Sequence, residues 1–240
     1  MNDSPQLGFW LETDNQAACE LGAILGYEAV ILDMEHGVIS STAADRLTLL
    51  CKTLGLTVFS RVSAAERVPI QQALDSGVDG VIIPQIRDAE HARAVSAYAK
   101  YPPLGGRGVG SNRTMGYGAT GSDFWEQENR CRYCFPMIET PGALDEADDI
   151  AALDTVDGLF LGPGDLSMTR GRGANRWTSA DIADAERMIL CATHAGKRWA
   201  MPAPNAETFE FARAHGALFV TVSDDLTALQ VGLAQGLAVI

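Results

Sequence analysis

Hydrophobic residues along the chain gather into eight short runs separated by polar, helix-forming segments. The runs are nearly continuous rather than alternating, as expected for parallel strands that are buried on both faces; they cover residues 7–11, 29–33, 57–62, 80–84, 133–139, 158–162, 198–202 and 217–222. Segments such as 179–196 have helical periodicity, and Gly77, Gly196 and Gly216 stand where a helix would end before the next strand. The pattern predicts an α/β protein in which strands and helices alternate.

Eight strands alternating with helices over 240 residues predict a single (β/α)8 TIM barrel, with residues 1–240 forming one domain. A doubly wound open sheet is the alternative, but such a sheet usually has fewer strands. No linker divides the chain. The longest irregular stretch, 101–121, is rich in glycine and contains Arg107 and Arg113. Loops of this length are usually functional or mobile, and this one lacks the glycine spacing of a nucleotide-binding loop.

The composition limits the compartment and the partners. No apolar run reaches 18 residues, and the N-terminal segment lacks a basic region followed by an apolar core, so we expect no membrane span, no signal peptide and a cytoplasmic location. The formal net charge of −13 argues against nucleic acid and against anionic membranes as partners. Cys131 and Cys134 form the one close cysteine pair, and we interpret them as buried thiols at a strand edge rather than as a metal or redox site.

Ionisable residues follow the C-terminal ends of four predicted strands, where the active sites of such barrels lie. They are Asp33, Glu35 and His36 after the second strand, Arg61 on the third, Glu139 on the fifth and Asp165 after the sixth. Each has an ordinary structural explanation: Asp165 could cap a turn, Arg61 could be an ion-pair partner, and His36 could be a loop histidine. A shared site is favoured because all of them lie on the same rim.

Glu139 and Asp165 suit a hard divalent cation. Two carboxylates with water molecules make the half-filled octahedral shell in which proteins usually hold Mg²⁺. The residues Gly162, Pro163 and Gly164 precede Asp165. Without side chains at positions 162 and 164, backbone N–H groups can closely approach an anionic ligand. The sequence therefore predicts a metal site beside a carboxylate-binding loop.

Asp33 lies three residues before His36, a spacing that suggests an oriented base. In this interpretation the carboxylate fixes the imidazole tautomer and raises its basicity, while Arg61 neutralises an oxyanion as it forms. The only lysines in the chain are Lys52, Lys100 and Lys197, and none is placed at the predicted rim. A Schiff-base mechanism is therefore disfavoured.

These motifs together resemble the HpcH/HpaI aldolases, metal-dependent class II pyruvate aldolases that include 2,4-dihydroxyhept-2-ene-1,7-dioate and 2-keto-3-deoxy-sugar-acid aldolases. The resemblance extends from about residue 8 to residue 224, and it rests on "DMEHG", "SRV", "ALDSGVDGVIIPQI", "YPPLGGRGVG", "MIETPGAL" and "VDGLFLGPGDLS". It implies that Glu139 and Asp165 bind Mg²⁺, Mn²⁺ or Co²⁺ and that Asp33 and His36 form a dyad. It also implies that Arg61 faces the substrate keto oxygen.

The resemblance carries further implications for ligands and assembly. Glu35 would lie beside the metal without ligating it directly, and Gly164 with its neighbours, Gly162, Pro163 and Asp165, would hold the pyruvate carboxylate. No nucleotide cofactor is implied. Family members are often hexamers built as trimers of dimers, with the last helix, here about 225–240, exchanged between subunits.

One position departs from the family pattern. Members often have glutamine two residues before the metal-binding glutamate, where this chain has Met137. In a strand, Met137 should point to the same side as Glu139, so its apolar side chain alters the donor end of the site. The segment 111–130 is also distinctive, and we expect such loops to determine the acceptor.

The expected activity is that of a carbon–carbon lyase that makes or cleaves 4-hydroxy-2-oxo acids through the enolate of pyruvate or hydroxypyruvate and an aldehyde. The expected partners are these small molecules and further copies of the same chain. Two alternatives stay open. One is a CoA-ester lyase of the citramalyl or malyl type, although such enzymes are usually longer. The other is a barrel that binds small acids without turnover.

Overall fold

The computed structural model describes residues 4–118 and 121–238. The first three residues of the N-terminal segment, part of the 101–121 stretch and the last two residues of the predicted terminal helix, including Ile240, lie outside the described residues.

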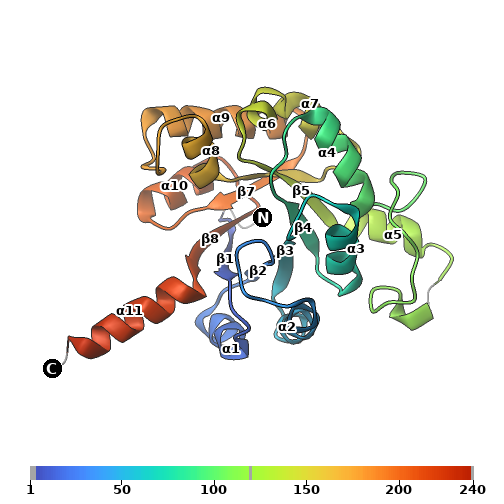
Figure 1. Ribbon diagram of the computed structural model, residues 1–240, viewed down its shortest axis with the longest axis horizontal. Coiled ribbons are helices and arrows are strands. Elements are labelled where there is room, and N and C mark those ends of the chain that lie inside the picture. The colour runs from blue at the N-terminus through green and yellow to red at the C-terminus, as the bar shows by residue number, and fades with distance from the viewer. Residues whose placement is uncertain (1–3, 119–120, 239–240) are drawn as a thin grey trace.

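Eight parallel strands form a closed barrel in which each strand pairs with its neighbours in chain order (Figure 1). The strands are β1 (Gln6–Leu11), β2 (Ala29–Asp33), β3 (Thr57–Arg61), β4 (Gly80–Ile83), β5 (Tyr133–Ile138), β6 (Gly158–Leu161), β7 (Arg198–Pro202) and β8 (Phe219–Asp224). Each predicted strand is present, with small differences at the ends, and β1 closes the barrel against β8. The predicted α/β TIM barrel is confirmed.

Helices follow the strands and, apart from the last one, lie around the outside of the barrel (Figure 1). They are α1 (Gln16–Leu25), α2 (Ser41–Thr53), α3 (Arg67–Asp75), α4 (Ala89–Ser96), α5 (Phe124–Cys131), α6 (Pro141–Asp145), α7 (Ala147–Ala151), α8 (Pro163–Thr169), α9 (Ser179–His194), α10 (Ala206–Ala214) and α11 (Asp225–Leu237). Gly77, Gly196 and Gly216 follow α3, α9 and α10 with positive φ, as predicted for residues that end helices. Within the described residues, no helix is long and apolar enough to cross a membrane.

Aromatic rings fill the inside of the barrel. Phe59 stacks on Phe219 with ring centroids 4.5 Å apart, and Phe135 packs against both. Gly158 makes room for this layer, because a Cβ there would lie 1.9 Å from the Phe135 ring. A packed interior of this kind closes the barrel below its rim, so a ligand can enter only at an end.

The stretch 101–121 is tied to the barrel by its arginines. Arg107 is buried and pairs with Asp75 of α3 at 2.7 Å, and Arg113 pairs with Asp45 of α2 at 2.7 Å. Both arginines therefore tie the described part of this loop to the helices α2 and α3.

The cysteine prediction is half right. Cys134 lies buried on β5, but Cys131 ends α5 and is exposed. The strand begins two residues after Cys131, which is why the two thiols have different surroundings.

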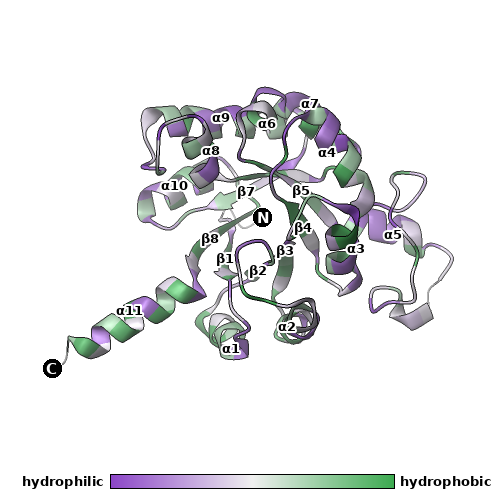
Figure 2. Ribbon diagram, viewed as in Figure 1, coloured by the Kyte–Doolittle hydropathy of each residue, from purple (hydrophilic) through white to green (hydrophobic). Residues whose placement is uncertain are grey.

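The last helix, α11, leaves the barrel instead of packing along it (Figure 1). Its apolar residues alternate with polar ones along its length (Figure 2), and Leu229, Leu233 and Leu237 are exposed. The helix begins at Asp225, where the sequence placed its start.

Candidate active site

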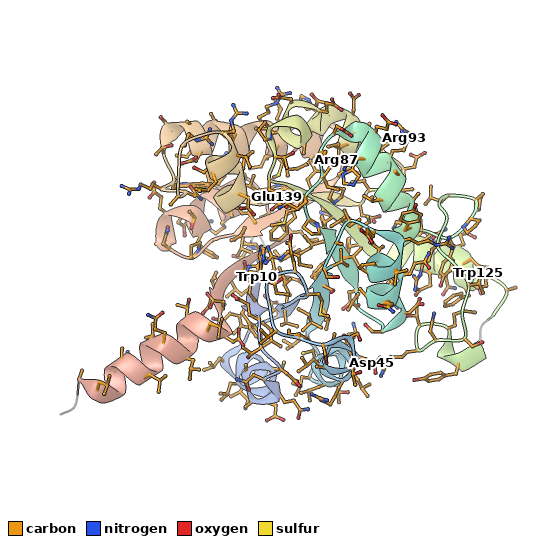
Figure 3. All side chains as sticks on the ribbon, in the orientation of Figure 1. Trp10, Asp45, Arg87, Arg93, Trp125 and Glu139 are labelled. Atoms are coloured by element: carbon orange, nitrogen blue, oxygen red, sulfur yellow. The ribbon has the colours of Figure 1, made fainter. Side chains whose placement is uncertain are left out.

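A cavity of about 470 Å³ opens at the C-terminal ends of the strands. Glu139 and Trp10, both of which line it, lie near the middle of the barrel in the view of Figure 3. The cavity brings together all the predicted site residues except Glu35: Asp33, His36, Arg61, Glu139, Gly162, Pro163, Gly164 and Asp165. The fold therefore assembles in one place residues that lie between positions 33 and 165 of the sequence.

Asp33 and Arg61 form a buried pair between neighbouring strands. Residues Asp33 of β2 and Arg61 of β3 are in register, and Arg61 donates from Nε to Asp33 Oδ1 at 3.0 Å and from Nη2 to Oδ2. The guanidinium also lies 4.7 Å from the centre of the Trp10 ring. Two carboxylate bonds and a stacked ring fix the plane of the guanidinium, and Nη1 keeps donor capacity for a ligand.

The predicted Asp33–imidazole contact is not formed. Asp33 Oδ1 accepts hydrogen bonds from the backbone N–H groups of Glu35 and His36, both at 3.1 Å, and the remaining capacity of the carboxylate serves Arg61. The His36 side chain is 60% exposed, and its Nε2 lies 3.8 Å from Glu35 Oε2. Asp33 therefore shapes the turn that carries His36, and Glu35 is the carboxylate beside the imidazole.

Glu35 has one carboxylate oxygen that accepts no hydrogen bond from the described residues. This oxygen, Oε2, is buried, and Arg61 Nε lies 3.5 Å away. Burial raises the pKa of the Glu35 carboxyl, while the charge of Arg61 lowers it. The oxygen is therefore available to an added donor or cation.

Glu139 is a buried carboxylate with a perturbed titration. It is 1% exposed, and its Oε1 accepts a hydrogen bond from the backbone N–H of Gln85 at 2.5 Å. Burial raises the pKa of Glu139 to about 7; the Gln85 N–H opposes this, and the nearby carboxylates of Glu35 and Asp165 add to it. Desolvation and like charge both penalise the ionised form, and a bound cation would relieve both.

Gly162 has a different role from the predicted one. A Cβ at this position would lie 2.7 Å from Glu139 Cβ and Oε2 and 3.0 Å from Met137 Cε, so the missing side chain makes room for Glu139. The Gly162 N–H donates to the Ile138 carbonyl at 3.1 Å, which makes it unavailable to a ligand. The N–H groups of Gly164 and Asp165 instead lie in the first turn of α8, where they have no partner within the helix.

Asp165 does not cap a turn. It lies in the first turn of α8, the helix has Gly162 at its N-cap, and no side-chain capping bond is made there. Its carboxylate is exposed and lines the cavity. The alternative interpretation of Asp165 as a helix cap is therefore wrong.

The carboxylates in the cavity fit a hard divalent cation. The protein would supply only part of the coordination shell of such an ion. In the described part of the chain, no group of three or more His, Cys, Asp or Glu residues forms a complete metal site. Glu139 and Asp165 supply two carboxylates, and the unpaired Oε2 of Glu35 lies nearby. A Mg²⁺-type site commonly uses one or two carboxylates and leaves its other positions to water and substrate.

The cavity wall is completed by four residues that were not predicted from the sequence: Trp10, Glu12, Pro202 and Asp224. A signal was present, because Glu12 directly follows the first predicted strand and Asp224 lies two positions beyond the last one. Met137 also lines the cavity, as expected from its placement on the same side of β5 as Glu139.

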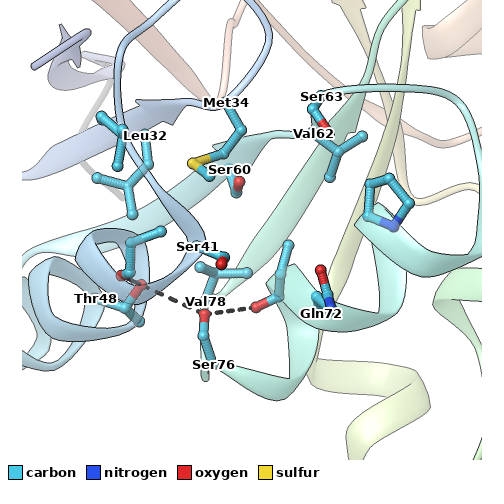
Figure 4. Close-up of a pocket in the computed structure, with 14 residues that line it drawn as sticks. Leu32, Met34, Ser41, Thr48, Ser60, Val62, Ser63, Gln72, Ser76 and Val78 are labelled. Atoms are coloured by element: carbon cyan, nitrogen blue, oxygen red, sulfur yellow. Dashed lines mark hydrogen bonds between the residues drawn. The ribbon is translucent and has the colours of Figure 1, made fainter.

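A second cavity, of about 300 Å³, lies outside the barrel wall between α2 and α3 (Figure 4). Ser76 donates to the Ala73 carbonyl there at 2.7 Å and lies 3.5 Å from the Thr48 hydroxyl. None of the residues that line it is ionisable. Of these two cavities, the one lined by Glu139 therefore has the groups needed for acid–base chemistry.

Comparison with known proteins shows which family the chain belongs to. A family model described as HpcH/HpaI aldolase/citrate lyase matches residues 6–230. The chain belongs to this family. The resemblance inferred from the motifs is thereby confirmed.

Similar members of this family are named as aldolases. A 4-hydroxy-2-oxo-heptane-1,7-dioate aldolase of Klebsiella pneumoniae is 34% identical over 95% of this chain and 86% of its own length. A 2-dehydro-3,6-dideoxy-6-sulfogluconate aldolase of Pseudomonas putida is 36% identical over 72% of this chain and 68% of its own length. The crystal structure of an HpcH/HpaI aldolase from Desulfitobacterium hafniense is 28% identical and superposes with a TM-score of 0.91, covering 99% of this chain and 93% of that one. Family and relatives together support a carbon–carbon lyase.

Proposed function

We propose that this protein is a class II, divalent-metal-dependent aldolase. It makes or cleaves 4-hydroxy-2-oxo acids, with pyruvate or hydroxypyruvate and an aldehyde as the smaller partners. One observation carries the proposal: two carboxylates, Glu139 and Asp165, share a cavity with an oriented guanidinium, that of Arg61. The names of the relatives support the same chemistry.

Glu139 and Asp165 would hold Mg²⁺, Mn²⁺ or Co²⁺. The donor set supports this, because a carboxylate as buried as Glu139 is stabilised in its ionised form by a nearby cation. When bound, the ion supplies Lewis-acid polarisation of the substrate's keto oxygen. The backbone N–H groups of Gly164 and Asp165 would orient the substrate carboxylate, with Pro163 and Gly162 shaping the loop.

Arg61 and His36 would act on the reacting atoms. Arg61 Nη1 would donate to the keto oxygen as that oxygen gains charge, in an orientation fixed by Asp33 and Trp10. In the cleavage direction the His36 imidazole would accept the proton of the C4 hydroxyl while the C3–C4 bond breaks, which releases the aldehyde and leaves the bonding pair in the enolate; the imidazolium would then return the proton to C3 of the enolate. Glu35, 3.8 Å from His36 Nε2, would stabilise the imidazolium that results.

The lysine positions support a mechanism without a Schiff base. Lys52 pairs with Asp79, which precedes β4, and Lys100 pairs with Asp157, which precedes β6. Lys197 donates to the carbonyls of residues 153 and 156, also before β6. All three amines thus lie toward the N-terminal ends of the strands, at the end of the barrel opposite Glu139.

We also propose that residues 1–240 act as one domain in a homohexamer, a trimer of dimers, in which α11 is exchanged between subunits. The exposed leucines of α11 support this, as does an apolar cavity of about 320 Å³ between α1 and the start of α11. The cytoplasm remains the predicted compartment, since all five cysteines are free thiols.

A metal-depletion experiment tests the function. Protein treated with EDTA should lose the cleavage of 4-hydroxy-2-oxo acids and recover it with Mg²⁺, Mn²⁺ or Co²⁺. Asp165→Asn should weaken the binding of Mn²⁺ in calorimetry, whereas Asp154→Asn, a surface change, should not. Full activity in excess EDTA, or a covalent pyruvate adduct after borohydride treatment, would contradict the proposal.

A further inference from the structure

Glu12 and Asp224 form an acidic wall on one side of the cavity. Asp224 of β8 is in register with Trp10 of β1, and Glu12 directly follows β1, so the two carboxylates lie at neighbouring strand ends. Both line the cavity, with Trp10 and Pro202 beside them. In a closed ring of eight strands, β1 stands opposite β5, which positions Glu139. The wall therefore faces the proposed metal ligands.

These two carboxylates lack a cationic partner within the described residues. Asp224 Oδ1 accepts the N–H of Thr227 at 2.6 Å as the N-cap of α11, and neither Asp224 nor Glu12 is in a salt bridge. Among the described residues that line the cavity, Arg61 is the one permanent cation, and it is bound to Asp33. Burial and the neighbouring carboxylates of Asp224, Asp33 and Asp225 raise the pKa of Glu12, and the charge of Arg61 offsets this only in part.

The acidic wall lies on the side of the cavity that the aldehyde-derived end of the substrate would occupy. The group that carries the carboxylate and the keto oxygen would occupy the side of Glu139, Asp165 and Arg61. The remaining part of a 4-hydroxy-2-oxo acid, which derives from the aldehyde, then extends toward Glu12 and Asp224. Carboxylates accept hydrogen bonds from hydroxyl groups but repel anions that come close to them.

We infer that Glu12 and Asp224 select an uncharged, hydroxylated aldehyde and disfavour aldehydes with a distal anionic group. This inference rests on the proposed aldolase function. An acceptor with a distal carboxylate or sulfonate, as the names of the two relatives above imply for them, would place like charge against the wall. A hydroxylated acceptor would donate to both carboxylates, with Trp10 and Pro202 as the apolar part of the wall.

The test compares matched acceptors in pyruvate addition by the full-length, Mn²⁺-loaded protein. Glyceraldehyde is the neutral hydroxylated probe, succinic semialdehyde the anionic one, and butanal a neutral aldehyde without hydroxyls. The variants are Glu12→Gln, Asp224→Asn and the double change; asparagine keeps the helix cap at position 224. Glu20→Gln, on the exposed face of α1, is the control for loss of one negative charge.

We expect the unmodified protein to use glyceraldehyde with a kcat/KM at least about tenfold above that for succinic semialdehyde. The double variant should gain about tenfold on succinic semialdehyde, corresponding to about 1.4 kcal/mol, mainly through the KM of the aldehyde. The KM of pyruvate and the use of butanal should change little, and Glu20→Gln should change nothing.

Equal use of glyceraldehyde and succinic semialdehyde by the unmodified protein would overturn the inference while leaving the aldolase function intact. So would a double variant with an unchanged preference. Turnover of none of the three aldehydes would overturn the aldolase proposal itself, and the inference with it.

Discussion

Arg61 is held against Asp33 by two hydrogen bonds between adjacent strands, one of them 3.0 Å long from Nε to Oδ1. The pair is nearly buried, with side chains that are 11% and 2% exposed. Because Trp10 covers the guanidinium, Arg61 has little freedom to turn. The third donor, Nη1, is therefore presented in a fixed direction.

Arg61→Lys should reduce kcat by about 10²-fold or more, since a lysine keeps the charge but cannot bridge both Asp33 oxygens and still donate to a substrate. Steady-state kinetics well below the unfolding temperature measures this. Arg46→Lys is the matched control, because Arg46 contacts both oxygens of Asp14 on the surface. Near-normal turnover of Arg61→Lys would leave Arg61 with a structural role alone.

His36→Ala should lower kcat by about 10²–10⁴-fold, the usual contribution of a general base. Since the His36 side chain is 60% exposed, the free energy of unfolding should hardly change. Metal affinity should also persist, because His36 is not a proposed ligand. His194→Ala, at the exposed end of α9, is the control. A variant at position 36 that cleaves substrate at the original rate would exclude His36 as the base.

Glu139 should make the metal-free protein less stable as pH rises. Its pKa in the folded state is about 7, above the ordinary value of 4.5. Between these values the folded protein retains a proton that the unfolded chain has lost, so the free energy of unfolding falls with rising pH. The full effect is on the order of 3 kcal/mol.

Urea denaturation of EDTA-treated protein between pH 5 and pH 8 measures this effect. Glu139→Gln removes the titrating group, so the free energy of unfolding of this variant should fall less between pH 5 and pH 8 than that of the unmodified protein. Added Mn²⁺ should restore the stability of the unmodified protein at pH 8 more than at pH 5. Parallel pH profiles for the two metal-free proteins would show that Glu139 titrates normally.

Gly162→Ala should cost about 1–3 kcal/mol of stability, as overpacking usually does, because its Cβ would meet Glu139 at 2.7 Å. It should also weaken Mn²⁺ binding by displacing that carboxylate. Gly164→Ala is the control, since a Cβ there has nothing within 4 Å. Thermal melts and calorimetry of both variants measure the difference; equal behaviour would mean that Glu139 can move aside without cost.

The sequence alone determined the barrel and most of the rim. Continuous apolar runs with helices between them are typical of parallel strands buried on both faces, so the strands 29–33 and 198–202 were predicted with the observed bounds. The rim residues followed from the strand ends: once β5 and β6 were placed, Glu139 and Asp165 had to lie near each other. These properties depend on the local pattern of apolar residues and on the order of the strands, and both can be read from the sequence.

Only the tertiary structure decided which side chains and backbone groups form hydrogen bonds or pack against one another. Asp33 bonds Arg61 and the backbone of the turn rather than the His36 imidazole, because register places Asp33 beside Arg61. Gly162 makes room for the Glu139 side chain instead of offering its own N–H, which the Ile138 carbonyl accepts.

The acidic wall of Glu12 and Asp224 also depends on the tertiary structure. Glu12 and Asp224 lie more than 200 positions apart in the chain, and they meet because β1 closes the barrel against β8. Spacing along a strand places a residue at the rim, but barrel closure and strand register decide which side chains meet there, and both depend on contacts between distant segments.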